Sequence, residues 1–309
     1  MALRRDSDNR TSSAPRGELR MDEPMSRHTT WRVGGPADQF YIPADLADLE
    51  QMLRQLPPQE PVFWLGLGSN LLVRDGGIRG TVIATLGALN GLEWLEGNIL
   101  RAEAGVPCAK VARFGICRHL VGPEFLAGIP GTMGGALAMN AGAFGGETWQ
   151  LVTRVETLDR HGRRHARGPE EFEVGYRHVT GKSGEWFVAA CLQLQPGDGA
   201  AAMARIRELL ERRNSTQPTR QPNAGSVFRN PPGDYAARLI EACGLKGTCI
   251  GGACVSEKHA NFIVNTGAAT AADIEALIER VAATVEQQHG IRLVREVHIV
   301  GEAAQAGWA

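Results

Sequence analysis

The sequence has almost no net charge, no long apolar run and few cysteines. Its 33 Lys and Arg against 34 Asp and Glu give a formal net charge of −1, which provides no general attraction to nucleic acid or to an anionic membrane. No segment approaches the roughly 18 apolar residues of a membrane-spanning helix, and the amino terminus lacks the apolar core of a signal peptide. We therefore expect a cytoplasmic protein with no nucleic-acid partner and no membrane insertion, and a monomer as the default state.

The 6 cysteines show neither CxxC spacing nor the alternation with histidine that zinc sites use. Cys249 and Cys254 are close in the chain, but the residues between them, which include Gly251 and Gly252, add no further metal ligands. A structural disulfide is unusual in the cytoplasm. The sequence therefore predicts no metal site and reduced, mostly buried thiols.

The chain contains enough apolar sequence for more than one domain, because 43% of its 309 residues are hydrophobic and 22% are charged. Residues 1–20 are rich in Arg, Ser, Asp and Asn without apolar periodicity, which predicts a disordered leader. Strands dominate residues 21–195, which indicates an α+β domain. The Pro-Gly-Asp-Gly turn that begins at Pro196 predicts a boundary to a smaller α/β domain over 196–309.

Hydrophobic periodicity and turn residues predict the elements of both domains. In the first domain we expect a helix capped by Asp45, a helix over 107–119, and strands over 38–42, 62–65, 81–85, 99–103, 152–158, 163–166 and 186–194. In the second domain we expect a helix ending before Asn214, helices over 235–243 and 271–288, and strands over 261–264 and 293–300.

The segment from residue 126 to residue 146 has a glycine density that the interior of a helix or strand would not tolerate without a reason. Backbone N–H groups without neighbouring Cβ atoms can converge on an anion, and pyrophosphate is the ligand most often held in this way. A glycine-rich surface loop is the alternative, but the run is apolar and lacks the Ser and Asn of such loops. The segment therefore predicts main chain in close contact with a ligand or a strand.

A second candidate phosphate loop, residues 66–72, follows a short apolar strand. It begins Gly-x-Gly, but Leu71 stands where the Rossmann fingerprint needs its third glycine, and no helical pattern follows. A Walker loop ending at Gly181-Lys-Ser also fails, because Tyr176 occupies the position of its first glycine. Two phosphate loops without a Rossmann pattern favour a flavin dinucleotide held by another fold.

Several blocks, taken in this order, resemble the family of UDP-N-acetylenolpyruvoylglucosamine reductases, and together they span most of residues 27–301. The blocks are Thr-Thr-Trp-Arg-Val-Gly-Gly-Pro-Ala at 29–37, Gly-Leu-Gly-Ser-Asn-Leu-Leu at 66–72, Ala-Gly-Ile-Pro-Gly-Thr-Met-Gly-Gly at 127–135, Asn-Ala-Gly-Ala at 140–143, Gly-Tyr-Arg at 175–177, Asn-Ala-Gly-Ser-Val-Phe-Arg-Asn-Pro at 223–231 and His-Ala-Asn-Phe-Ile-Val-Asn at 259–265. The chain looks like the subgroup that lacks a long tyrosine-bearing loop.

The resemblance implies an FAD-binding domain of the vanillyl-alcohol-oxidase/p-cresol-methylhydroxylase type, followed by a smaller substrate-binding domain whose last strand returns to the active site. It further implies non-covalent FAD, NADPH as electron donor, and a UDP-sugar substrate whose enolpyruvyl ether is reduced to UDP-N-acetylmuramate for peptidoglycan synthesis. In the family, hydride passes from NADPH to the flavin and then to C3 of the substrate.

Three catalytic residues carry over by motif: Arg177, Ser226 and Glu296. A guanidinium at Arg177 suits the carboxylate on which charge develops, and a protonated Glu296 with a raised pKa would donate to the same charge. Ser226 is the implied proton donor to C2, with Arg229 and Asn230 beside it as supports. From spacing alone, a surface charge is the favoured interpretation of Arg177 and of Glu296, whereas Ser226 is as readily a turn residue as a catalytic one.

Further residues are implied as ligand contacts. The expected cofactor-binding residues are Gly66, Gly68, Ser69, Asn70, Leu71, Gly128, Ile129, Pro130, Gly131, Thr132, Gly134, Gly135, Asn140 and Gly142, and the expected substrate-binding residues are Arg213, Arg229, Asn230, His259 and Asn261. Val179 and Gln217 depart from residues that family members often carry. The alternatives are a related FAD-dependent alcohol or sugar oxidase and a non-catalytic nucleotide-binding module.

Overall fold

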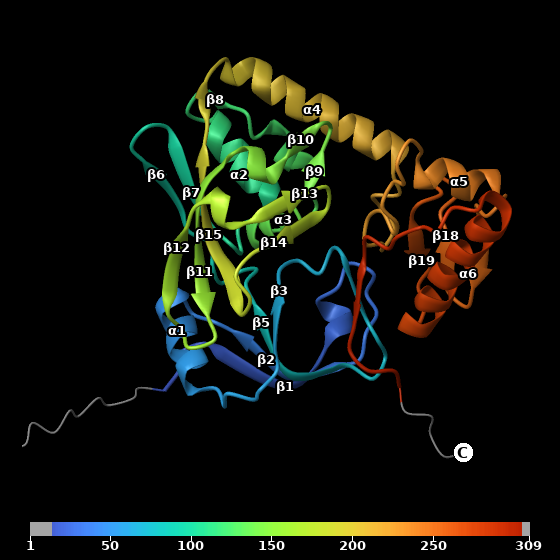
Figure 1. Ribbon diagram of the computed structural model, residues 1–309, viewed down its shortest axis with the longest axis horizontal. Helices are drawn as coiled ribbons and strands as arrows, with labels where there is room; N and C mark the ends of the chain where they lie inside the picture. The colour runs from blue at the N-terminus through green and yellow to red at the C-terminus, as the bar shows by residue number, and fades with distance from the viewer. Residues whose placement is uncertain (1–13, 305–309) are drawn as a thin grey trace, which may run out of the picture.

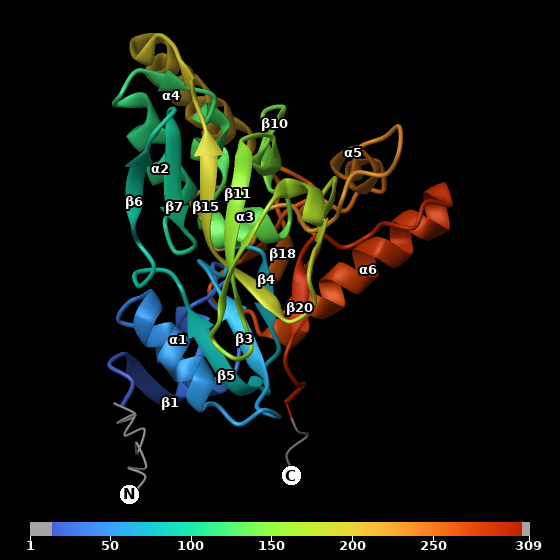
Figure 2. The same ribbon diagram turned by 60° about the vertical axis from the view of Figure 1, so that its left-hand side comes forward.

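A computed structural model describes residues 14–304, arranged as two α+β subdomains and a C-terminal domain (Figures 1 and 2). Residues 1–13 of the expected leader lie outside the described residues. The predicted leader extends too far, because the first strand starts at Glu18, before the predicted start of order near Met21. No helix of the described part is long and apolar enough to cross a bilayer.

The first subdomain is a sheet in the order β1-β2-β5-β3, in which β2, β5 and β3 run parallel and β1 pairs antiparallel with β2. Its strands are β1 (Glu18–Pro24), β2 (Pro36–Ile42), β3 (Val62–Leu65) and β5 (Ile78–Ala84). Helix α1 (Leu46–Gln55) begins as predicted, because the Asp45 carboxylate accepts the Asp48 N–H at 2.8 Å. Its apolar face packs against strands of both subdomains.

The second subdomain is an antiparallel sheet in the order β12-β11-β15-β7-β6, covered by helices. Its strands are β6 (Leu92–Leu95), β7 (Ile99–Glu103), β11 (Val152–Asp159), β12 (Arg164–Arg167) and β15 (Glu185–Gln193). The remaining elements are α2 (Cys108–Ile116), α3 (Met133–Ala138), the two-strand pairs β8 (Leu120–Val121) with β16 (Gln195–Pro196), β9 (Gly142–Ala143) with β10 (Gly146–Glu147) and β13 (Glu173–Gly175) with β14 (His178–Thr180), and the 3-10 turns η1 (Met25–Arg27), η2 (Glu124–Gly128), η3 (Thr148–Gln150) and η4 (Pro169–Glu171).

Helix α4 (Gly199–Thr216) corrects the expected domain boundary at residue 196. Ala202 and Ile206 on this helix are buried in the core of the second subdomain, where α4 packs against η2 and α2. The helix also continues to Thr216, past the expected end before Asn214. The change from one core to the next therefore lies after α4, since a boundary falls where few apolar contacts cross.

The C-terminal domain packs α5 (Ala236–Ala242) and α6 (Ala271–His289) on an antiparallel sheet of β17 (Cys249–Ile250), β18 (Ala253–Val255) and β19 (Ile263–Asn265). The last strand, β20 (His298–Val300), leaves this domain and pairs in parallel with β4 (Leu71–Val73) of the first subdomain (Figure 2). The strand expected over 293–300 is confirmed only at its end. Most of residues 291–297 belong to no strand. Residues 294–297 contact the 227–229 loop through separate backbone hydrogen bonds and one isolated bridge, which do not form a continuous strand pair.

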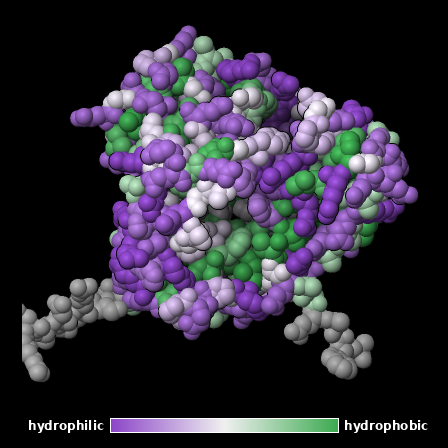
Figure 3. Space-filling view, in the orientation of Figure 1, coloured by the Kyte–Doolittle hydropathy of each residue, from purple (hydrophilic) through white to green (hydrophobic). Residues whose placement is uncertain are grey.

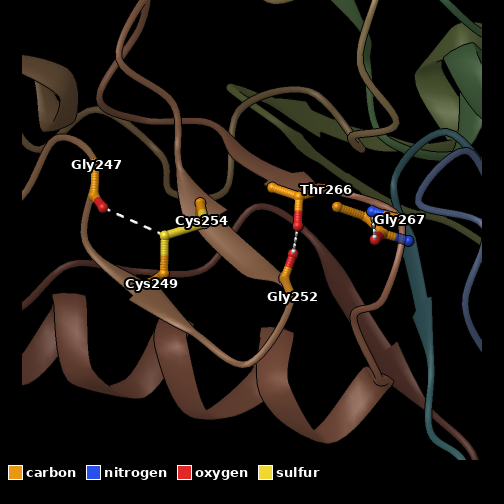
Figure 4. The surroundings of a disulfide bond; sticks show 7 residues. Gly247, Cys249, Gly252, Cys254, Thr266 and Gly267 are labelled. Atoms are coloured by element: carbon orange, nitrogen blue, oxygen red, sulfur yellow. Dashed lines mark hydrogen bonds between the residues drawn. A yellow bond between two sulfur atoms is a disulfide. The ribbon is translucent and has the colours of Figure 1, made fainter.

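A disulfide joins Cys249 and Cys254 across the β17–β18 hairpin (Figure 4), so the expectation of reduced thiols is wrong for this pair. The two residues face each other in the strand register, with Cα atoms 4.1 Å apart. Sequence reasoning weighed the compartment and did not consider that a tight hairpin brings these two side chains together. Cys108, Cys117, Cys191 and Cys243 are free.

Candidate active site

The surface is hollowed on the face shown in Figure 3. Residues from the carboxyl end of β3, from the second subdomain and from the C-terminal domain line cavities in the structure. Cavities of about 510 Å³, 270 Å³ and 640 Å³ adjoin there. Leu65 and Gly66 line both the first and the second, and Ser69 and Pro130 line both the first and the third. The cavities therefore form one cleft around the loops at 66–70 and 128–132.

The loop after β3 requires its glycines. A Cβ on Gly68, whose φ is +68°, would lie 2.1 Å from the His28 carbonyl oxygen, and a Cβ on Gly66 would lie 2.4 Å from the Thr132 hydroxyl. Glycine is therefore needed at position 68 for the close approach to His28 and at position 66 for the close approach to Thr132. The Thr132 hydroxyl and the Trp64 indole N–H are buried without a hydrogen-bond partner in the described structure.

The glycine-rich segment differs in part from the expected loop. The chain turns at residues 129–132 and then forms α3, so Gly134 and Gly135 lie within a helix. A Cβ on Gly134 would lie 2.9 Å from the Ala104 Cβ, and the Gly134 N–H donates to the Ala104 carbonyl. The reason for glycine here is close packing of a short helix on the chain that follows β7.

Most of the expected cofactor-binding residues line the cleft. They are Gly66, Ser69, Asn70, Gly128, Ile129, Pro130, Gly134, Gly135 and Gly142. The other five, Gly68, Leu71, Gly131, Thr132 and Asn140, line none of the three cavities, and their contacts to the cofactor stay predictions. The Leu71 side chain is buried in the core of the first subdomain, and the Asn140 side chain is 1% exposed and bonded to protein groups.

The three expected catalytic residues come from different parts of the chain and line the same 640 Å³ cavity. Arg177 lies in the turn between β13 and β14 with a φ of +54°. Its Nε donates to the Glu296 carboxylate at 3.0 Å, and its Nη2 donates to the Gly142 carbonyl at 2.9 Å. Ser226 follows Gly225, whose N–H donates to the Asn223 side chain at 2.9 Å.

The Glu296 carboxyl is largely buried, with 13% of its side chain exposed. Burial raises its pKa above the usual range of a glutamate, and the nearby Arg177 and Arg229 guanidinium groups act in the opposite direction without cancelling the effect. This is the direction expected from the sequence. The charge of Arg229 also acts on this carboxyl, and the Arg229 Nε is buried without a partner in the described structure.

The expected substrate-binding residues divide into two groups. Arg213 lines both larger cavities, and burial lowers the pKa of its guanidinium. Arg229, Asn230, His259 and Asn261 line none of these cavities, and their contacts to the substrate stay predictions. Asn230 accepts the Ala236 N–H that begins α5, at 3.1 Å.

Asn261 holds both the N–H and the carbonyl of Phe228, at 3.0 Å and 2.8 Å, and thus fixes the backbone two residues after Ser226. The His259 ring lies edge-on to Phe262, with the ring centroids 4.7 Å apart, and burial lowers its pKa.

Sequence reasoning missed other cations along the cleft. Arg27, Arg32, Arg205, Arg212 and Arg220 line it together with Arg213. The spacing of Arg205 and Arg212 on α4 was a readable signal, because residues seven apart share one face of a helix.

Two family models match the chain. One, described as "FAD binding domain", covers residues 37–166, and the other, described as "UDP-N-acetylenolpyruvoylglucosamine reductase, C-terminal domain", covers residues 217–300. The glycine-lined cleft and its unpartnered buried polar atoms fit such a group. Together with the first match, they place the chain in the class of FAD-binding proteins.

Curated relatives identify the family. The chain is 66% identical over 287 residues to UDP-N-acetylenolpyruvoylglucosamine reductase of Alkalilimnicola ehrlichii, covering 93% of this chain and 96% of the relative. It is also 66% identical over 299 residues to that of Methylococcus capsulatus, covering 97% and 98%. The chain therefore belongs to the UDP-N-acetylenolpyruvoylglucosamine reductase family and is an oxidoreductase with FAD as its cofactor.

A solved structure agrees with this assignment. The crystal structure of UDP-N-acetylenolpyruvylglucosamine reductase from Thermus caldophilus matches with a TM-score of 0.76 at 32% identity, covering 92% of this chain and 98% of that one. The resemblance inferred from sequence motifs is confirmed, as is the expected fold class, an FAD-binding domain followed by a second domain.

Proposed function

We propose that the chain reduces the enolpyruvyl ether of a UDP-N-acetylglucosamine derivative to UDP-N-acetylmuramate, with NADPH as electron donor. The observation that carries the proposal is the convergence of Arg177, Ser226 and Glu296 on one cavity beside the glycine loops. The glycine loops at 66–70 and 128–132 would hold FAD, which would supply the hydride for C3 of the enolpyruvyl group with NADPH as its source.

Arg177 holds the substrate carboxylate. Hydride addition at C3 leaves negative charge on C2, which spreads into the attached carboxylate as an enolate. A guanidinium remains protonated and donates parallel hydrogen bonds to such a group, in a position fixed before the reaction. Arg177 is suited to this role because Glu296 and Gly142 hold its orientation within the cavity.

Glu296 supplies a further hydrogen bond to the same charge. Its raised pKa favours the protonated carboxyl, in which one oxygen accepts from Arg177 while the other presents an O–H. Ser226 then donates its proton to C2, and the cations of Arg177 and Arg229 nearby stabilise the alkoxide that remains. C3 thus gains hydride and C2 gains a proton.

Ser226→Ala tests the proposal, because the hydroxyl is needed only for the second half-reaction. Under anaerobic conditions, NADPH should bleach the flavin absorbance of the variant at nearly the unmodified rate. Recovery of absorbance on adding the enolpyruvyl sugar nucleotide should slow by at least about 1000-fold, the scale of lost acid catalysis.

Ser183→Ala is the matched control, since Ser183 is exposed in the connection between β14 and β15. Equal slowing of both half-reactions by Ser226→Ala would contradict the assigned role. Flavin that ignores NADPH but is reoxidised by oxygen after reduction by an alcohol or sugar would favour the oxidase alternative. Protein that binds nucleotide but never changes its flavin spectrum would favour a binding module.

A further inference from the structure

Asn140 lies behind the catalytic cavity and connects three segments of the chain. Its side chain is 1% exposed, and its backbone is left-handed with a φ of +44°. The amide nitrogen donates to the Glu147 carboxylate at 2.9 Å and to the Gly175 carbonyl at 3.1 Å. The amide oxygen accepts the Trp149 N–H at 3.2 Å. One buried amide therefore joins the glycine-rich segment to the β10–η3 turn and to the last residue of β13.

The backbone around Asn140 holds Arg177 directly. The Nη1 of Arg177 donates to the Asn140 carbonyl at 3.4 Å, and Nη2 donates to the Gly142 carbonyl at 2.9 Å. A Cβ on Gly142 would lie 3.3 Å from the Arg177 Nη1, so glycine at this position leaves room for the guanidinium beside the Gly142 carbonyl. Gly175, which the Asn140 amide binds, lies two residues before Arg177. The Asn140 side chain thus supports the backbone that supplies the two carbonyl acceptors of the guanidinium. It also supports the end of β13, which leads into Arg177.

These contacts leave part of the guanidinium free for a ligand. Arginine has five N–H donors, and contacts to Glu296, Asn140 and Gly142 use three of them. The donors that remain belong to Nη1 and Nη2, the pair that grips a carboxylate in parallel. Their direction depends on where the two backbone carbonyls lie, and hence on Asn140.

We propose that Asn140 is a positioning residue that aims Arg177 at the substrate carboxylate, and that it does not contact the cofactor. The inference rests on the proposed role of Arg177. An error of about 1 Å in the position of a group that stabilises developing charge can lower the rate about 100-fold. Loss of the Asn140 amide should therefore slow substrate reduction and spare the flavin site.

Asn140→Asp tests this role with almost no change in volume. A carboxylate cannot donate to Glu147 or to the Gly175 carbonyl, and it places like charges side by side. Stopped-flow measurement should show flavin reduction by NADPH within about twofold of the unmodified protein, and reoxidation by the enolpyruvyl substrate slowed about 10- to 100-fold. FAD content and the thermal midpoint are measured in parallel.

Two further variants sharpen the test. Combining Asn140→Asp with Glu147→Gln reverses the polarity of the lost hydrogen bond, since the new amide donates to the new carboxylate, and should recover part of the reoxidation rate. Asn98→Asp is the matched control, because Asn98 is also left-handed, with a φ of +61°, but is exposed at the β6–β7 turn. If Asn140→Asp fails to hold FAD, Glu147→Ala replaces it, and its reoxidation rate should fall while reduction by NADPH does not.

Two results would overturn the positioning role. One is an FAD-loaded variant whose reoxidation rate matches that of the unmodified protein, and the other is equal slowing of both half-reactions, which indicates general damage. Failure of the unmodified protein to be reoxidised by the enolpyruvyl substrate would instead overturn the proposed function. Normal reoxidation of the unmodified protein together with an unaffected variant would overturn the positioning role alone.

Discussion

The contact between Arg177 and Glu296 matters more for the placement of charge in the cavity than for the stability of the fold. Both side chains are partly buried, with 17% and 13% exposed, and desolvation offsets much of the attraction within such a pair. Burial has the larger effect on Glu296 and raises the pKa of its carboxyl despite the adjacent guanidinium. The protonation state then decides whether Glu296 donates a hydrogen bond into the cavity or only accepts one.

The raised pKa of Glu296 predicts a pH dependence of substrate reduction. Below the raised pKa the Glu296 carboxyl is mostly protonated, and it loses its proton as pH rises through that pKa. The rate of flavin reoxidation by the substrate should therefore fall as pH rises through the pKa of Glu296. The same shift lowers the free energy of unfolding as pH rises through the folded-state pKa, because the folded protein must then bury a charge. Stopped-flow reoxidation across a pH series measures the first effect.

Glu296→Gln is the control for this assignment, because an amide donates a hydrogen bond at every pH. We expect a lower rate, by about 10-fold, without the decrease at rising pH. A variant that keeps the full pH dependence would assign it to another group.

Elements far apart in the sequence assemble the joint between the first subdomain and the C-terminal domain. β4 and β20 pair in parallel, and the residues just after β4 continue the contact. The Asp75 carboxylate accepts the N–H groups of Ala271 and Ala272 at 3.0 Å and 2.9 Å, and thus caps the first turn of α6 from another domain. Arg74 pairs with Glu275 on the same helix at 2.7 Å. These contacts hold β20, and with it the segment that carries Glu296.

Asp75→Ala should lower the free energy of unfolding by about 1–2 kcal/mol, since it removes a charged cap from α6. Denaturant unfolding at neutral pH, fitted for midpoint and slope, measures the loss. Asp75→Asn keeps an acceptor oxygen and should lose less. Equal stability of the alanine variant and the unmodified protein would show that Thr270, which caps the same helix by accepting the Asp273 N–H, is sufficient alone.

At the scale of the whole molecule, side chains of the first subdomain, namely Trp31, Val33 and Leu72, complete the core of the C-terminal domain. Trp31 is 0% exposed and packs within the cluster built from α5, α6 and β18. Its indole N–H donates to the Ile263 carbonyl at 2.8 Å, and its own carbonyl accepts from the Asn265 amide at 2.9 Å. The C-terminal domain is therefore fastened to the subdomain that supplies the 66–70 loop.

Trp31→Ala should cost about 3–5 kcal/mol of the free energy of unfolding, because it opens a large cavity in a shared core. FAD should stabilise the variant less than the unmodified protein, since the cleft depends on the fastened domains. Thermal unfolding with and without added FAD measures both effects. Trp94→Ala, at a partly buried position of β6 in another core, is the comparison. An equal loss of unfolding free energy and of stabilisation by FAD in the two variants would contradict a specific role of Trp31 in joining the domains.

Local sequence determined the elements whose signals are complete within a short window. The helix capped by Asp45, the helix α6 and the strands β11 and β12 all appear close to their predicted bounds. Motif order likewise determined the family and its FAD-binding domain. These features depend on neighbours in the chain, so the residues themselves carry the information.

Only the tertiary structure decided which residues meet. Nothing in the local pattern of Asn140 or Asn261 distinguishes an amide that touches a ligand from one that holds a loop, and the Cys249–Cys254 bond and the place of α4 depend on packing with distant partners. The Arg177–Glu296 pair joins positions 119 residues apart. Such contacts arise when separate elements bury apolar surface together, and a single sequence read in short windows contains no record of that pairing.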